Sequence, residues 1–120
     1  MTEAPTRRRP RSAPDAGAVL ALDRARIERA LPRRERYKYV QPRVLADGGG
    51  WKIVSANCSR SVDPAGGEID IARFLPAPDG LWQLQARDDA QATWITRADA
   101  LTLAAALARV MADPLGEYWR

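Results

Sequence analysis

The stretch LWQLQARD, residues 81–88, alternates apolar and polar side chains along its whole length. Trp82, Leu84 and Ala86 fall on one side of the segment, whereas two glutamines and an arginine fall on the other. A period of two is that of a β-strand, and a strand with one apolar and one polar face is common in antiparallel sheets. The stretch therefore predicts a sheet that is covered on one side only.

Segments of similar strand-like composition lie on both sides of this stretch. They are RYKYVQPRVLA, WKIVSANC, EIDIARFL and ATWITR, at residues 36–46, 51–58, 68–75 and 92–97. Short turn sequences separate most of them, namely DGGG, PAPDG and DDAQ. Strands joined by such short turns run antiparallel. We therefore expect a sheet of about five strands arranged in hairpins.

Helical periodicity precedes and follows the strands. AGAVLALDRARIERAL, residues 16–31, follows a possible N-cap at Asp15 and stops at Pro32. ADALTLAAALARVMA, residues 98–112, ends before an Asp-Pro pair. Its alanines should let it pack closely. The predicted fold is a two-layer α+β domain over residues 15–120, with an antiparallel sheet flanked by an N-terminal and a C-terminal helix.

The composition excludes several classes of function. The chain of 120 residues has no histidine and one cysteine, which excludes Ser-His-Asp and Cys-His catalysis and removes the commonest metal ligands. We expect no cofactor, no metal and no enzymatic activity. Because no apolar run is long enough for a membrane span and a single cysteine cannot form an internal disulfide, we expect a cytoplasmic protein.

Positive charge is concentrated at the start of the chain. Residues 1–43 hold twelve Lys/Arg against five Asp/Glu, a net +7, and the remainder holds seven against ten, a net −3. Residues 1–14, MTEAPTRRRPRSAP, have three prolines and few apolar side chains, so we expect a disordered basic arm. This asymmetry points to an acidic partner.

Several motifs in the last two-thirds of the chain form a recognisable order: GWKIVSANCSRSVDPAGGEIDIARF, LWQLQARD and DPLGEYW. The motif positions are Ala72, Arg73, Phe74, Trp82, Leu84, Arg87, Asp88, Trp94, Asp113, Pro114, Tyr118 and Trp119. From Arg36 to its end, the chain resembles a family of small bacterial proteins catalogued as domain of unknown function 3024. The resemblance implies a domain type and adds no catalytic residue.

The arginine-rich first third is the first candidate site. Its candidate residues are cationic, with two tyrosines among them: Arg7, Arg8, Arg9, Arg11, Arg24, Arg26, Arg29, Arg33, Arg34, Arg36, Tyr37, Lys38 and Tyr39. Arginine pairs with phosphate in a fork geometry, and tyrosine offers a face on which a base can stack. These residues predict weak, salt-sensitive binding of nucleic acid or another polyanion. The alternative is a charged surface that only keeps the chain soluble, partly neutralised by Glu28 and Glu35.

The polar loop NCSRSVDPAGGEID, residues 57–70, is the second candidate. Asn57, Cys58, Ser59, Arg60 and Ser61 could hold a small anion, since the glycines that follow let backbone N–H groups approach. The alternative is a surface crossing between two strands, in which the cysteine packs into the core as a small apolar residue.

Two further possibilities concern the sheet. The carboxylate pairs Asp88-Asp89 and Glu68 with Asp70 could serve acid–base chemistry, but we interpret them as turn formers and as partners for arginines. The uncovered face could bind a protein or form a homodimer. We expect that face to carry Lys52, Val54, Glu68, Asp70, Phe74, Gln83, Gln85 and Trp94.

Overall fold

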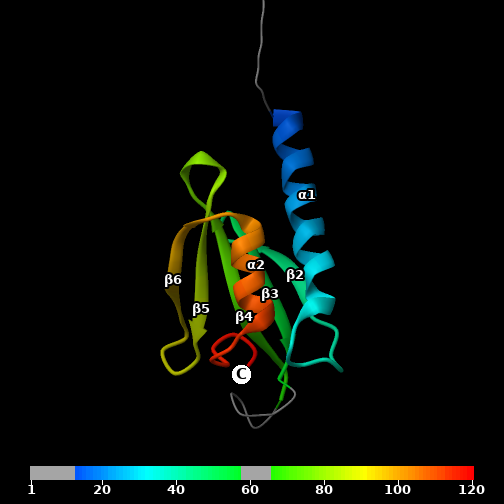
Figure 1. The fold of residues 1–120 in the computed structure, drawn as a ribbon, viewed down its shortest axis with the longest axis vertical. Helices are drawn as coiled ribbons and strands as arrows, with labels where there is room; N and C mark the ends of the chain where they lie inside the picture. The colour runs from blue at the N-terminus through cyan, green and yellow to red at the C-terminus, as the bar shows by residue number, and fades with distance from the viewer. Residues whose placement is uncertain (1–12, 58–65) are drawn as a thin grey trace, which may run out of the picture.

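The computed structural model of the chain describes residues 13–57 and 66–120, with side chains from residue 21 onward. Its elements follow one another as helix, five strands and helix, with two short 3-10 turns (Figure 1). They are α1 (Ala13–Ala30), η1 (Leu31–Arg33), β2 (Arg43–Asp47), β3 (Gly50–Ala56), β4 (Glu68–Pro76), η2 (Pro78–Gly80), β5 (Trp82–Asp88), β6 (Thr93–Leu101) and α2 (Leu103–Ala112). Residues 1–12 of the predicted arm lie outside the described residues, and its last two positions belong to α1.

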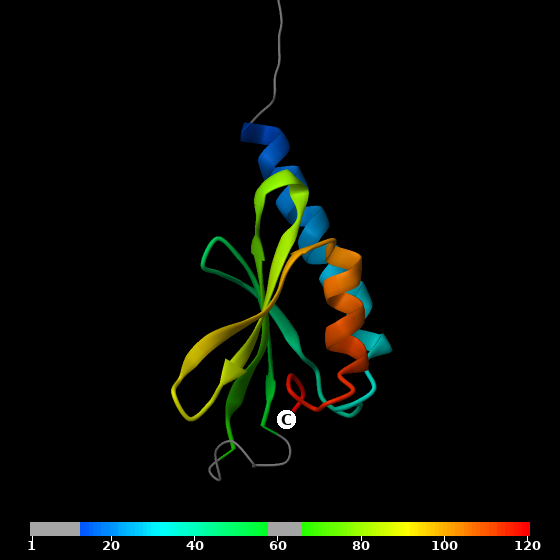
Figure 2. The same cartoon turned by 60° about the vertical axis from the view of Figure 1, so that its left-hand side comes forward.

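The five strands form one antiparallel sheet in sequence order, β2-β3-β4-β5-β6. Both helices lie against the same face of this sheet, side by side (Figures 1 and 2). The core lies between the two layers and contains Ile27 from α1, Leu107 and Val110 from α2, and Ile53 and Leu84 from the sheet. The predicted two-layer α+β fold is confirmed.

A bulge in β4 changes which of its residues face the core. Ile53 pairs with Ala72 and Val54 pairs with Asp70, so Ile71 is an extra residue on β4. The alternation of faces therefore shifts by one position after Ile71. Phe74, which we expected on the open face, is fully buried in the core. That expectation was wrong because it continued the alternation of Glu68 and Asp70 through the bulge.

The end of β6 and the start of α2 also differ from the prediction. Ala98 and Leu101 pair with β5, although the sequence pattern assigned both to the C-terminal helix. The helix begins only at Leu103, because the side chain of Thr102 caps it by accepting the N–H of Ala105 at 3.1 Å. The cap sets the boundary, and the four residues before it extend the edge strand.

The chain end is tied to the last turn of α2 by one buried carboxylate. Asp113 adopts a left-handed conformation with φ of 41° and caps the helix. Its carboxylate accepts the backbone N–H groups of Glu117, Tyr118 and Trp119, the shortest at 2.8 Å. The indole of Trp119 in turn donates to the carbonyl oxygen of Val110 at 2.9 Å. These hydrogen bonds tie the closing motif DPLGEYW to the end of α2, and we call them the C-terminal hydrogen-bond cluster.

The segment between η1 and β2 is not a strand, contrary to the prediction for residues 36–42. The buried guanidinium of Arg34 donates to the carbonyl oxygens of Leu31, Tyr37 and Val40 at 2.7–3.0 Å. Three carbonyls that converge on one side chain cannot also lie in an extended ladder. The segment therefore curls around Arg34, and β2 begins only at Arg43.

Candidate functional site: an arginine-lined groove

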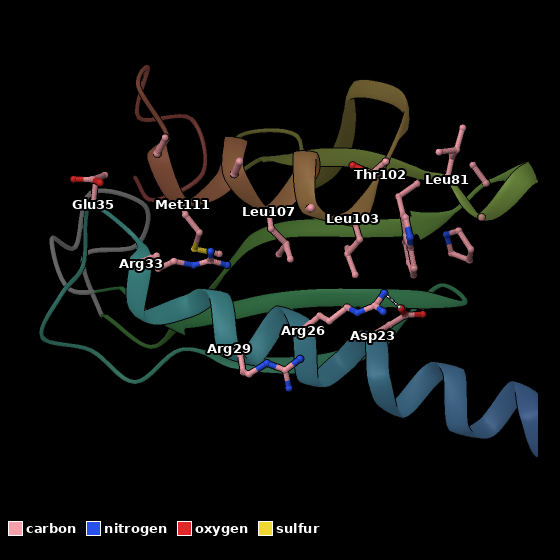
Figure 3. Close-up of a pocket in the computed structure, with 17 residues that line it drawn as sticks. Asp23, Arg26, Arg29, Arg33, Glu35, Leu81, Thr102, Leu103, Leu107 and Met111 are labelled. Carbon is pink, nitrogen blue, oxygen red and sulfur yellow. Dashed lines mark ion pairs between the residues drawn. The ribbon is translucent and has the colours of Figure 1, made fainter.

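A groove of about 980 Å³ runs between α1 and α2, on the helical layer of the domain (Figure 3). Arg26 and Arg29 of α1 and Arg33 of η1 line one side of it. These positions follow a spacing of three and then four residues, which places them on one face of a helix. Sequence reasoning named all three, and the structure shows that they meet at one groove.

The floor of the groove is apolar. It is formed by Leu103, Leu107 and Met111 of α2 and by Trp82 of β5, each less than one-tenth exposed. In Figure 3 the three α2 side chains point toward α1, and Arg33 extends toward Met111 from the other side. The site therefore combines guanidinium groups with a sheltered hydrocarbon surface.

The α2 side of the groove is lined by small residues. Ala104, Ala108 and Ala112 are exposed and recur every four residues along α2. We expected these alanines to let α2 pack closely, but they border open space instead. Sequence reasoning missed them, together with the floor residues, as parts of a site. The signal was an alanine stripe beside the apolar stripe of the same helix.

Few acidic groups neutralise these arginines. Asp23 lies 3.7 Å from Arg26, and Glu35 lines the opposite end of the groove. Burial raises the pKa of Asp23 above its ordinary value, and Arg26 only partly opposes this shift. Within the described part of the chain, Arg29 and Arg33 form no ion pair. The groove is thus cationic on the α1 side.

The other predicted residues that the structure describes do not line this groove. Arg24 forms an ion pair with Glu28 at 3.5 Å and lies over the ring of Trp51. Arg36 lies 4.0 Å from Asp113. Lys38 and Tyr39 are exposed on the loop that follows η1. Arg7, Arg8, Arg9 and Arg11 lie outside the described residues.

Two of the predicted residues have structural roles. Arg34 is 7% exposed, and it stacks over Trp119 while donating to three backbone carbonyls. Tyr37 is half-buried and packs against Trp119, with ring centroids 5.9 Å apart. The guanidinium of Arg34 is therefore engaged within the fold, and Tyr37 is only partly exposed.

Four of the five residues of the predicted anion site lie outside the residues that the structure describes. They are Cys58, Ser59, Arg60 and Ser61. Asn57 is buried, and its backbone N–H donates to the carbonyl oxygen of Gly67 at 2.8 Å. This hydrogen bond joins the end of β3 to the residues just before β4. The anion-binding hypothesis for the loop stays a prediction.

Side chains on the open face of the sheet bond mainly to one another. Arg73 of β4 reaches Asp47 at 3.2 Å and Gln85 at 2.7 Å, and Gln85 donates to Gln83, which donates to Asp99. The chain of contacts joins β2, β4, β5 and β6 in that order. Its hydrogen-bonding groups are therefore largely engaged within the face.

A second set of contacts crosses the same face. Asp70 lies 3.0 Å from Lys52 and 3.6 Å from Arg87. The guanidinium groups of Arg73 and Arg87 lie 4.9 and 5.2 Å from the centre of the Trp94 ring. Trp94 lies on the open face as expected, but the two arginines already contact its ring.

The carboxylates considered for acid–base chemistry hold structural contacts. Glu68 forms a bidentate pair with Arg43, and Asp89 pairs with Arg120. Asp88 accepts the backbone N–H of Gln91 in the turn. Among residues 13–57 and 66–120, no group of three potential metal ligands lies together. In the same residues, no helix is long and apolar enough to cross a membrane.

One family model, described as "Domain of unknown function (DUF3024)", matches residues 16–120. The match includes α1 except its first three residues, whereas the motifs indicated a resemblance only from Arg36 onward. The groove thus lies inside the matched region. No curated protein and no solved structure matches the chain.

The motif residues explain the fold better than the site. Phe74, Trp82 and Leu84 are buried in the core, and Arg73 and Arg87 flank Trp94 on the open face. Asp113, Tyr118 and Trp119 form the C-terminal hydrogen-bond cluster at the end of α2. The arginines of the groove lie outside all of these motifs.

Proposed function

The chain belongs to the family of domain of unknown function 3024, and from the geometry of its groove we propose that it binds a polyanion. The observation that carries the proposal is the meeting of Arg26, Arg29 and Arg33 along one groove, where Asp23 and Glu35 are the acidic residues among the described lining. Nucleic acid is the polyanion to test first, because phosphate matches the guanidinium fork.

The shape of the site supports attraction of anions. A cleft with low-dielectric walls concentrates the field of the charges that line it. The apolar floor of Leu103, Leu107 and Met111 supplies such a wall beside the arginines. Arg29 and Arg33 are exposed and can reorient toward a ligand. Binding through these few contacts is weak and decreases with salt.

The interface can include residues beyond those that line the groove. Lys38 and Tyr39 are exposed on the loop after η1, and Tyr39 offers a face for stacking. Residues 1–12 add four arginines against one glutamate. The proposed interface therefore has its centre in the groove, with contributions from the loop and the N-terminal residues.

Catalysis and dimer formation have less support. The candidate carboxylates form ion pairs or turn contacts, which favours a binding protein over an enzyme. The open face, proposed from the sequence for a protein partner or a homodimer, satisfies many of its polar groups internally. A partner would have to break these contacts without a large apolar patch in return.

The proposal is tested by fluorescence anisotropy with labelled single-stranded and duplex oligonucleotides over a range of salt concentrations. We expect weak binding whose logarithmic affinity falls linearly with the logarithm of salt concentration. Replacing Arg26, Arg29 and Arg33 together with glutamate should abolish it. Binding that is absent at low salt for every oligonucleotide and for heparin contradicts the proposal.

A matched pair of single variants separates the groove from general charge. Arg29→Ala and Arg109→Ala each remove one exposed helical arginine and change the net charge equally, but only Arg29 lines the groove. We expect Arg29→Ala to weaken binding several-fold and Arg109→Ala to leave it nearly unchanged. Equal losses would show that net charge, not the groove, determines affinity.

A further inference from the structure

We infer that the groove binds an acidic amphipathic helix of a partner protein. The inference rests on the proposed function and narrows its polyanion to one class. It begins from the exposed apolar lining of the groove, which phosphate groups do not need. A nucleic acid backbone would contact the arginines and make no use of Ala104, Ala108 and Ala112, which border the groove and are exposed.

Helix-in-groove recognition uses apolar side chains at positions i, i+3 or i+4, and i+7. The ten residues of α2 span about 15 Å, which corresponds to about three turns of a bound helix. A helix along the groove can therefore place three or four apolar side chains against its apolar lining. It would lie on the open side of the groove, across α1 and α2, which already contact each other.

The two sides of the groove suit the two flanks of such a helix. On one side, Ala104, Ala108 and Ala112 are small and exposed, so a helix backbone can approach α2 closely. On the other side, Arg26, Arg29 and Arg33 cover seven residues of helical spacing, or about 10 Å. The bound helix should therefore carry glutamate or aspartate along the flank that faces α1.

Charge argues against occupants from this chain itself. Residues 1–12 contain four arginines and one glutamate, so they share the sign of the groove. In a second copy, α2 (LAAALARVMA) has no acidic residue, and α1 carries three arginines against three acidic residues. Neither offers a flank with a net negative charge. The complementary occupant is a separate acidic chain.

The inference is tested with three labelled probes and the full-length protein, by anisotropy and calorimetry. The first is a synthetic peptide of about 14 residues, four helical turns, with leucines along one face and glutamates beside them. The second has the same composition in an order that destroys the amphipathic pattern. The third is a single-stranded oligonucleotide. We expect the first peptide to bind at least about tenfold more tightly than either of the others.

A pair of alanine substitutions tests the position of the helix. Ala104→Phe places a ring in the groove, whereas Ala105→Phe places one on the adjacent exposed position of α2 that does not line it. Both variants keep the arginines and the net charge. Ala104→Phe should weaken binding of the amphipathic peptide about tenfold or more, and Ala105→Phe should leave the affinity nearly unchanged.

The outcomes distinguish this inference from the proposed function. Equal affinity for the two peptides, tighter binding of the oligonucleotide, or equal effects of the two phenylalanine substitutions would overturn the helix and leave polyanion binding in place. A concentration-dependent dimer that competes with the peptide would identify a second copy as the occupant and overturn it too. If no probe binds at low salt, both proposals fail.

Discussion

At the scale of single residues, Arg33 and Arg34 are adjacent and chemically identical, but they have different roles. Arg33 is exposed and lines the groove. Arg34 is buried, donates to three backbone carbonyl oxygens and stacks on the ring of Trp119. The sequence could group both in a basic third, but it could not separate them. Their exposure depends on the curl of residues 36–42 and on the C-terminal tail.

Substitution of Asp113 tests how much the C-terminal hydrogen-bond cluster contributes to the stability of the fold. Replacing Asp113 with alanine removes the acceptor of three backbone N–H groups, two of them buried, and places alanine at φ 41°. We expect Asp113→Ala to lower the free energy of unfolding by about 4 kcal/mol, because unpaired buried N–H groups and a left-handed alanine are both unfavourable. Urea denaturation followed by tryptophan fluorescence measures this change.

Asp113→Asn is the matched control for this variant. Asparagine tolerates the left-handed conformation and keeps one acceptor oxygen. It should cost about half as much as the alanine variant. If the free energy of unfolding of the alanine variant lies within about 1 kcal/mol of the wild-type value, the C-terminal hydrogen-bond cluster contributes little to stability.

Tyr118 predicts a specific dependence of stability on alkaline pH. Burial, with a smaller contribution from Glu117, raises the pKa of Tyr118 from about 10 to about 12. Between these values the unfolded chain has lost the phenolic proton and the folded chain still holds it. The free energy of unfolding therefore falls as pH rises from about 10 to 12, by about 2–3 kcal/mol in total.

The difference between the wild type and Tyr118→Phe isolates this contribution, since other groups titrate equally in both. Urea denaturation of both proteins at several pH values from about 9 to 12 gives the two stability curves. The wild-type curve should fall more steeply across this window. Parallel curves would mean that the hydroxyl of Tyr118 titrates at its ordinary value.

At the scale of elements, the sequence predicted the number and type of elements better than their edges and faces. The alternation of LWQLQARD identified β5 and its buried face correctly. The bulge at Ile71 reversed the faces within β4, and the cap at Thr102 moved a boundary by about five residues. Both depend on a single local contact that a periodic pattern does not contain.

Gly50 should be the most restrictive glycine of the β2–β3 hairpin. A Cβ added there would lie 2.0 Å from the carbonyl oxygen of Phe74 in β4, so a backbone would have to move. We expect Gly50→Ala to lower the free energy of unfolding by about 3 kcal/mol. Urea denaturation provides the measurement.

Gly49→Ala is the matched control in the same hairpin. An added Cβ there meets nothing within 4 Å, and the substitution is opposed only by a φ of +83°. It should cost about 1 kcal/mol. If Gly49→Ala destabilises the protein as much as Gly50→Ala, the close approach of β3 to β4 is not what selects glycine.

At the scale of the whole molecule, the two layers use their charges differently. The open face of the sheet pairs many of its cations with acids and with Trp94. The helical layer leaves Arg29 and Arg33 without acidic partners in the described chain, beside an apolar floor. Three of the twelve cations of residues 1–43, Arg26, Arg29 and Arg33, therefore line one groove, while cations and acids of the sheet largely pair with one another.

Two parts of the chain can contribute to binding, namely the arginines of residues 1–12 and the groove. Deletion of residues 1–12 should distinguish their contributions. The deleted segment carries four arginines, and each phosphate contact to a single strand contributes about 0.7 to the logarithmic salt slope. Oligonucleotide binding should therefore weaken, and its slope should decrease by up to about 3. Binding of the amphipathic peptide should change little, because the groove and its floor remain. Anisotropy titrations of both probes over the same salt series measure the two effects. Equal losses for peptide and oligonucleotide would mean that the N-terminal arginines, rather than the groove, dominate both interactions.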